Sequence, residues 1–216
     1  MGLFFPIGLK LARHECLVVG GGEVAQRKAE SLLQVEARVT VIAPQVTSQL
    51  RAWAEAGVLR WIPREYRSGD VDGFALVIAA TDVEAVNQQV AAEARARRVL
   101  VNVCDQPELC GFIVPAVVRR GSLTLAVFTG GQSPMLARKI REDLERQYGL
   151  EYAEFLEILG SLRRRLRREV PDPRKRQEIY RRLVHSDALE RLRQGRRAQV
   201  EAMAEQLIAL VRANSG

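Results

Sequence analysis

The sequence contains few of the residues that hold metal ions or cross-link a chain. Of its 216 residues, three are cysteine and two are histidine. The histidines, His14 and His185, lie far apart in the sequence, and the odd number of cysteines shows no zinc-site spacing. We therefore predict no metal site. Three reduced thiols are typical of a cytoplasmic protein.

Long hydrophobic runs and targeting signals are also missing. No apolar run approaches the roughly 18 residues that cross a membrane. The first positive charge, Lys10, follows the short N-terminal apolar patch, whereas a secretory signal has the opposite order. Pro6 stands where a myristoylation motif needs serine or threonine. We expect no export and no membrane partner.

Aromatic residues are scarce, at 6%, and this bears on the meaning of the net charge of +7. Nucleic acid is one explanation for a basic protein, and a polyanionic small substrate is another. The arginine-rich tail from residue 151 onward has only Tyr152, Phe155 and Tyr180 as aromatics, and two of these lie on or beside an apolar helical stripe. Because stacking platforms for bases are lacking, nucleic acid is not favoured.

The most informative stretch is residues 15–28, ECLVVGGGEVAQRK. A short apolar strand leads directly into glycines and then into helix-forming residues. Gly20, Gly22 and Ala25 fit the G-x-G-x-x-G/A dinucleotide fingerprint in its strand–turn–helix context. The first glycine permits a tight turn, the second lets the backbone approach a pyrophosphate, and the small third residue allows close packing. The alternative is a glycine-rich turn that binds no ligand.

Apolar strands and helical patterns alternate up to about residue 112, which predicts a Rossmann-like, doubly wound parallel sheet of the α/β class. Residues 3–11 are expected to add a short strand or an arm. The expected strands are 16–19, 38–43, 59–62, 74–80 and 99–103, and the expected helices are 24–35, 48–56 and 83–97.

The pattern changes near residue 113. Two apolar strands over 112–118 and 122–128 resemble a hairpin, and Ser133 followed by Pro134 is typical of a helix start. Strands are no longer expected after residue 151. We predict a nucleotide-binding domain at 1–112, a small α+β segment at 113–148 and an all-α domain at 149–216. The apolar hairpin has open edges, which favours pairing with a second copy.

Ligands of open α/β sheets bind beyond the carboxyl ends of the strands. Thr81 and Asp82 follow one such strand, although this pair is equally suited to cap the next helix. Asn102 and Asp105 stand at the end of another. Asp105 is either a general base or a turn residue before Pro107.

Four strings in order, GGGEVAQRK, IAATDVEAVN, NVCDQPELCGFIVPA and TGGQSPMLARKIRE, resemble the siroheme synthase N-terminal region family. Its members are precorrin-2 dehydrogenases, some of which are also sirohydrochlorin ferrochelatases. The resemblance covers about residues 3–145 and implies NAD-dependent oxidation of precorrin-2 to sirohydrochlorin. It also implies that the segment at 113–148 forms a homodimer. Since no methyltransferase domain follows, we expect another protein to methylate the precursor.

Carried over residue by residue, the resemblance implies these roles. Asp105 is the catalytic residue. The anionic substrate carries several carboxylates, which arginines such as Arg119, Arg120 and Arg138 and also Lys139 would attract. The cofactor-binding set is Gly20, Gly21, Gly22, Glu23, Val24, Pro44, Gln45, Thr81, Asp82 and Asn102, and the substrate-binding set is Thr129, Gly130, Gly131, Ser133 and Arg138.

Three questions stay open at this point. A Rossmann module that senses NAD without catalysis is the alternative function, although it would need neither Asp105 nor the TGGQSP loop. The acidic residue expected about 20 positions after the fingerprint is missing, with Pro44 and Gln45 near that place, so NAD and NADP are not distinguished. Whether Fe²⁺ is a second substrate is not determined.

Overall fold

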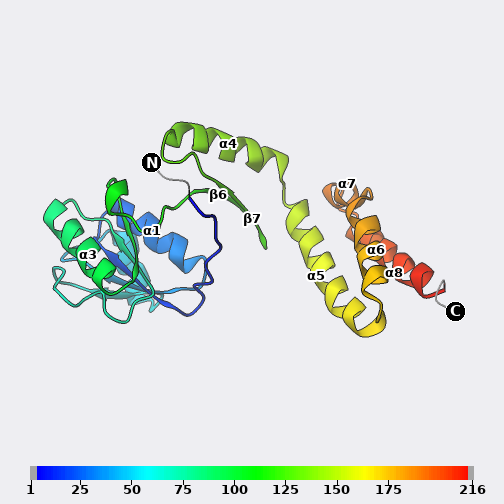
Figure 1. Ribbon diagram of the computed structural model, residues 1–216, viewed down its shortest axis with the longest axis horizontal. Coiled ribbons are helices and arrows are strands. Elements are labelled where there is room, and N and C mark those ends of the chain that lie inside the picture. Colours follow the sequence, from blue (N-terminus) through cyan, green and yellow to red (C-terminus); the bar gives the residue numbers. More distant parts are fainter. Residues whose placement is uncertain (1–3, 214–216) are drawn as a thin grey trace. The chain divides into compact units, whose positions relative to one another are not determined.

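The computed structural model describes the backbone of residues 4–213 and the side chains of residues 4–210. The chain divides into two compact units, one ending at Val114 and the other beginning at Pro115 (Figure 1). No helix within the described part of the chain is long and apolar enough to cross a membrane. The further division at residue 148 stays a prediction.

The first unit is the predicted doubly wound fold. Its five strands are all parallel, in the order β3-β2-β1-β4-β5. The predicted elements are confirmed, with ends that differ by one to a few residues. The strands are β1 (Glu15–Val19), β2 (Arg38–Ile42), β3 (Arg60–Ile62), β4 (Leu76–Ala79) and β5 (Leu100–Val103), and the helices are α1 (Glu23–Leu33), α2 (Ser48–Glu55), α3 (Glu84–Ala96) and the 3₁₀ turn η1 (Pro107–Leu109).

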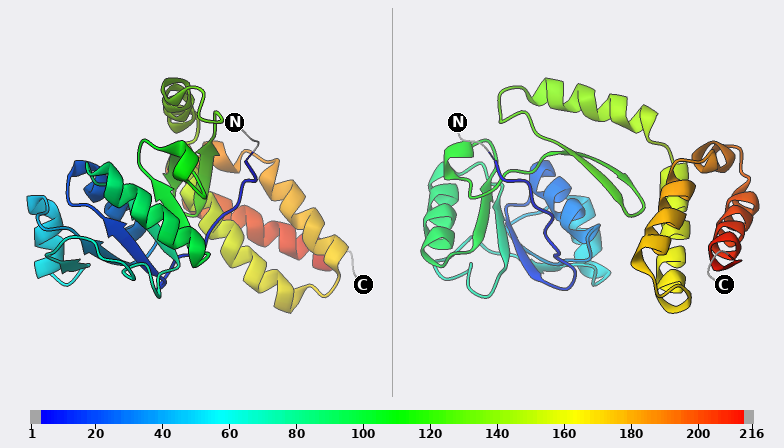
Figure 2. Two further views of the ribbon diagram at one scale, coloured as in Figure 1. Left: turned by 60° about the vertical axis from the view of Figure 1, so that its left-hand side comes forward. Right: turned by 45° about the vertical axis from the view of Figure 1, so that its right-hand side comes forward.

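Helices cover both faces of this sheet (Figure 2). Side chains alternate between the faces of a strand, so β1 feeds two cores. Cys16 and Val18 pack with α1 and α2, whereas Leu17 and Val19 pack with α3. Burial on both sides explains why the strand is a continuous apolar run.

The N-terminal segment contains no strand in its described part. Residues 4–10 have no regular secondary structure, so of the two alternatives the segment is an arm; Leu3 lies outside the described residues. Phe5 and Ile7 are exposed, at 87% and 63%. Pro6 cannot donate a backbone hydrogen bond, which disfavours pairing with a neighbouring strand.

The second unit begins with an antiparallel hairpin followed by helices. Gly121 has φ +55° at the turn of the hairpin. Ser133 caps the next helix by accepting a hydrogen bond of 3.1 Å from the Leu136 N–H, and Pro134 occupies its first turn, as predicted. The elements are β6 (Ala116–Arg120), β7 (Leu123–Val127), α4 (Pro134–Gln147), α5 (Glu151–Glu169), α6 (Pro173–Val184), α7 (Ala188–Arg193) and α8 (Arg197–Ala213).

The helices from α5 onward share one apolar core. Leu166 of α5 and Ile179 and Leu183 of α6 are fully buried. Pro171 and Pro173 separate α5 from α6, because proline cannot continue a helix but suits the first turn of the next one.

Candidate functional site

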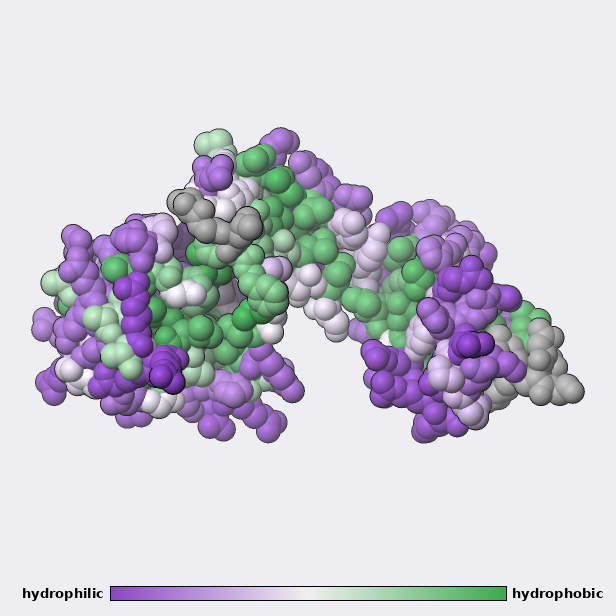
Figure 3. All heavy atoms as spheres, in the orientation of Figure 1, coloured by the Kyte–Doolittle hydropathy of each residue, from purple (hydrophilic) through white to green (hydrophobic). Residues whose placement is uncertain are grey.

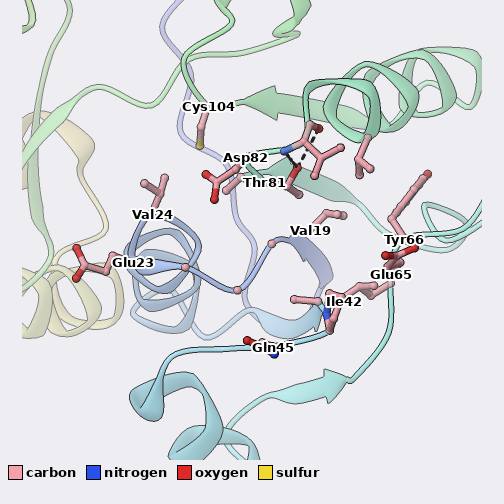
Figure 4. A pocket seen from close by; sticks show the side chains of 18 of the residues that line it. Val19, Glu23, Val24, Ile42, Gln45, Glu65, Tyr66, Thr81, Asp82 and Cys104 are labelled. Carbon is pink, nitrogen blue, oxygen red and sulfur yellow. Dashed lines mark hydrogen bonds between the residues drawn. The ribbon is translucent and has the colours of Figure 1, made fainter.

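A cavity of about 710 Å³ opens at the carboxyl ends of β1, β2 and β4 in the first unit (Figure 4). Its volume lies in the range of small-ligand pockets, roughly 300–1,000 Å³. It stands where the strand order reverses, beside the turn after β1. The cavity brings together most of the predicted residues: Gly20, Gly21, Gly22, Glu23, Val24, Pro44, Gln45, Thr81, Asp82 and Asp105.

The three positions of the glycine turn differ in whether backbone packing requires a glycine. Gly20 has φ +125°, and a Cβ there would overlap the carbonyl oxygen of Ala80. A Cβ on Gly21 would overlap the carbonyl oxygen of Gln45, whereas a Cβ on Gly22 would meet nothing within 4 Å. The first two glycines are therefore required by backbone packing, and the third faces open space in the cavity.

A stability experiment distinguishes a glycine that packing requires, Gly21, from one that faces open space, Gly22. Gly21→Ala is expected to lower the free energy of unfolding by roughly 1–3 kcal/mol, as overpacking does, because backbone must move to admit the methyl group. Gly22→Ala, its neighbour in open space, is expected to lower the free energy of unfolding by less than about 1 kcal/mol, the cost of a poorer N-cap. Urea denaturation of both variants provides the measurement. Equal stability of the two variants would contradict this interpretation of the glycine turn.

The start of α1 presents backbone N–H groups without intrahelical partners at the cavity. Gly22 is the N-cap and provides no side-chain hydrogen bond, and the first intrahelical bond is donated by Gln26 to the Gly22 carbonyl. The N–H groups of Glu23 and Val24 therefore lack an intrahelical acceptor and lie at the positive end of the helix. This arrangement fits the pyrophosphate of a dinucleotide.

The end of β4 is shaped by side-chain hydrogen bonds rather than by a cap on α3. The Thr81 hydroxyl accepts from the Val83 N–H at 3.1 Å, and the Asn87 side chain donates to the Thr81 carbonyl at 2.9 Å. Val83 is the N-cap and gives no side-chain bond, so neither Thr81 nor Asp82 caps the helix. Asp82 is exposed and borders the cavity (Figure 4).

Asn102 lies outside this cavity and in an adjoining one. It is 7% exposed, and its amide donates to the Phe112 carbonyl at 3.0 Å. It also contacts the Cys110 sulfur at 3.4 Å. Asn102 thus holds the loop that follows β5, and direct contact with a cofactor stays a prediction.

Asp105 is exposed and borders both cavities. Its φ of +63° places it in the left-handed region, which aspartate tolerates better than most residues. No described residue forms an ion pair with its carboxylate. Beside it, burial raises the pKa of the Cys104 thiol. The conformation suits a turn, and the position suits a proton acceptor at the cavity mouth, so both roles remain.

Glu65 and Tyr66 also line the cavity, and sequence reasoning missed them. In Figure 4 they lie on the other side of the view from Cys104. The Tyr66 hydroxyl donates to Glu93 of α3, and burial together with this hydrogen bond raises the pKa of Tyr66. The sequence offered one signal for them: this loop follows β3, and ligands bind beyond the carboxyl ends of such strands.

The predicted substrate residues belong to the second unit, where several of them have structural partners. The Thr129 hydroxyl donates to the Ser133 carbonyl at 3.1 Å, and Gly130 and Gly131 have positive φ values of +62° and +77°. Arg138 donates to Glu142 at 2.9 Å and is well exposed. A role for these residues in binding substrate stays a prediction.

Arg120 has a structural role of its own. Its guanidinium donates to the carbonyls of Tyr148 and Glu145, at 2.9 and 3.1 Å, near the end of α4. A positive charge is favourable at the carboxyl end of a helix.

Among the described residues, no group of three or more His, Cys, Asp or Glu side chains is placed to hold a metal ion.

Comparison with known proteins gives matches along most of the chain. Residues 7–116 match the family model described as "Putative NAD(P)-binding". Residues 120–147 match the model of the sirohaem biosynthesis protein central region, and residues 151–208 match the sirohaem synthase dimerisation region. The chain belongs to the siroheme synthase N-terminal region family.

Relatives within this family are similar over nearly the whole chain. A siroheme synthase of Pseudomonas paraeruginosa is 41% identical over 206 residues, which is 95% of this chain and 44% of that protein. One from Methylococcus capsulatus is 41% identical over 198 residues, 92% of this chain and 42% of that protein. The chain therefore spans less than half the length of these curated relatives.

A solved structure has a similar fold. The chain titled "SirC, precorrin-2 dehydrogenase" superimposes with a TM-score of 0.78 at 27% sequence identity, covering 94% of this chain and 100% of that one. The family and the fold inferred from the four sequence strings are thus confirmed.

Proposed function

We propose that this protein oxidises precorrin-2 to sirohydrochlorin with NAD as the hydride acceptor. The observation that carries the proposal is that one cavity joins the glycine turn to Asp105 in a chain of this family. The solved relative named a precorrin-2 dehydrogenase matches along its full length, which supports the same substrate.

The residues of the cavity fit a dinucleotide. Open space at Gly22 and the uncapped start of α1 suit a pyrophosphate, and the exposed Pro44 and Gln45 would border the adenosine half. When bound, NAD accepts a hydride at its nicotinamide ring. Asp105 would take the proton that leaves the tetrapyrrole in the same oxidation.

The deciding experiment is to incubate the purified protein with precorrin-2 and NAD and to follow the absorption spectrum. We expect sirohydrochlorin to form only when NAD is present. Addition of Fe²⁺ afterwards tests whether the metal is a second substrate. A protein that binds NAD but leaves precorrin-2 unchanged would instead be a nucleotide sensor.

The three free cysteines support a reducing, cytoplasmic location.

We further propose that the protein is a homodimer formed by the segment 113–148. Hydrophobic side chains gather over α4 and the hairpin in Figure 3. On α4, Met135 and Leu136 are 82% and 49% exposed. A two-stranded sheet also leaves open edges. The dimerisation-region model matches the helices at 151–208 instead, so the position of the interface needs its own test.

Sedimentation at micromolar concentration provides that test. We expect a dimer for the natural protein and dissociation for Leu136→Glu, because a buried, unpaired carboxylate at an interface is costly. Val184→Glu, on a residue of α6 that is 46% exposed, is the matched control and is expected to leave the dimer intact. A natural protein that sediments as a 24.2 kDa monomer would refute the dimer. Dissociation by Val184→Glu alone would place the interface in the helical region.

A further inference from the structure

A second cavity, of about 550 Å³, lies next to the glycine-turn cavity within the first unit. One of its walls is a face of α1, and the other is formed by the residues around and after the end of β5. Val24, Cys104 and Asp105 border both cavities. A molecule in the second cavity would therefore share Asp105 with an occupant of the first.

The α1 wall is a single helix face. Val24, Arg27, Lys28 and Ser31 are spaced at three- and four-residue intervals, which brings their side chains onto one side of the helix. Arg27 is exposed and Lys28 is half-buried. Two positive charges thus stand one helical position apart at the edge of the cavity.

Neither Arg27 nor Lys28 forms a salt bridge with a described carboxylate, although many other arginines are paired. The charge of Lys28 acts on Cys104, which lines the same cavity: burial raises the pKa of the Cys104 thiol, and Lys28 opposes this rise. Among the described residues that line this cavity, one side chain is acidic, that of Asp105.

The facing wall is mainly apolar. Its apolar side chains are Pro107, Ile113 and Val114, of which Val114 is 46% exposed, and Cys104 lies beside them. The amide of Asn102 and the carboxylate of Asp105 are its polar groups, whereas the side chain of Val103 packs with the core on the α3 side of the sheet. A cavity with one basic wall and one apolar wall fits a flat, apolar ring that carries carboxylates at its edge.

We propose that the second cavity holds one carboxylate-bearing edge of the tetrapyrrole, with Lys28 and Arg27 pairing with its carboxylates. The inference rests on the proposed function and adds two substrate-positioning residues to it. The substrate ring would lie on the apolar wall, and its edge toward Asp105 would face the cavity that holds NAD. Arg27 and Lys28 would then set which ring of the macrocycle reaches the nicotinamide.

The test measures steady-state kinetics of Lys28→Gln beside Arg60→Gln. Arg60 is an exposed arginine of β3 that lines neither cavity, so its loss is a matched control for charge. For Lys28→Gln we expect KM for precorrin-2 to rise about tenfold, as for loss of one charge-assisted hydrogen bond, while KM for NAD stays within about twofold. Lys28→Arg should restore most of the affinity, and Arg60→Gln should resemble the natural protein.

Equilibrium binding of sirohydrochlorin keeps this inference separate from the proposed function. It needs no turnover, and it reports on a carboxylated tetrapyrrole directly. Weaker binding by Lys28→Gln supports the subsite even if the natural protein does not oxidise precorrin-2. Equal binding by Lys28→Gln and the natural protein, or an equal rise in KM for NAD, overturns the subsite even if the enzyme is active. No binding of sirohydrochlorin by the natural protein also overturns it.

Discussion

Asp105→Asn is expected to slow sirohydrochlorin formation by roughly 10²- to 10⁴-fold, the usual contribution of a general base. Asparagine keeps the size of the side chain and tolerates the left-handed backbone that Asp105 adopts at φ +63°. The substitution therefore removes the proton acceptor and leaves the turn in place. Asp105 has no ion pair with a described residue, so the change breaks no salt bridge.

The measurement is the initial rate of sirohydrochlorin formation at saturating NAD. Affinity for NAD and the thermal melting curve should match those of the natural protein. Glu108→Gln is the matched control, since Glu108 is an exposed acid of η1 that borders neither cavity. Near-natural turnover by Asp105→Asn would show that Asp105 is a turn residue before Pro107. Catalysis would then depend on positioning, with the proton passing to solvent.

If Fe²⁺ insertion occurs as well, its rate should also fall in Asp105→Asn, because metal entry releases protons from the ring nitrogens.

Gly22→Val is expected to weaken NAD binding while the protein stays folded. A valine side chain would occupy the open space beside the start of α1 and keep the pyrophosphate away from the free N–H groups. Loss of a single hydrogen bond to a charged group costs roughly 1.5–3 kcal/mol, which is about 10- to 150-fold in affinity.

Calorimetric titration with NAD measures this loss, and Gly22→Ala gives a graded comparison because its methyl group fills less of the space. The stability of Gly22→Val should fall by no more than about 1 kcal/mol, the cost of a poorer N-cap. This tolerance distinguishes Gly22 from Gly20 and Gly21, whose Cβ atoms would overlap backbone. A folded Gly22→Val variant with natural NAD affinity would show that the cofactor does not approach this turn.

Much of the fold could be predicted because its signals are local. The apolar run before Gly20 and the helical pattern after Gly22 specify strand, turn and helix within 20 residues. Repetition of that pattern predicts the parallel sheet, and the parallel sheet brings the strand ends to one edge. Asp105 and Asp82 were found in this way, since each follows a strand whose burial is evident from composition.

The tertiary structure decided what depends on packing between distant segments. Gly21 must be glycine because the Gln45 carbonyl lies against it, a contact that spacing does not reveal. Tyr66 reaches the cavity through an irregular loop held by Glu93 of α3, 27 residues further along the chain. The Asn102 amide also holds the loop at Phe112, a structural role that its place at a strand end does not reveal.

The basic face of α1 shows the same division most clearly. The spacing of Arg27 and Lys28 on one side of a helix follows from the sequence, because the helical period is a property of the backbone. That this side borders a cavity next to Asp105, with Ile113 and Val114 opposite, follows from the path of the chain after β5. Local hydrogen bonding sets the spacing of side chains on the helix. Burial of side chains from separate segments sets which part of the chain that helix face meets.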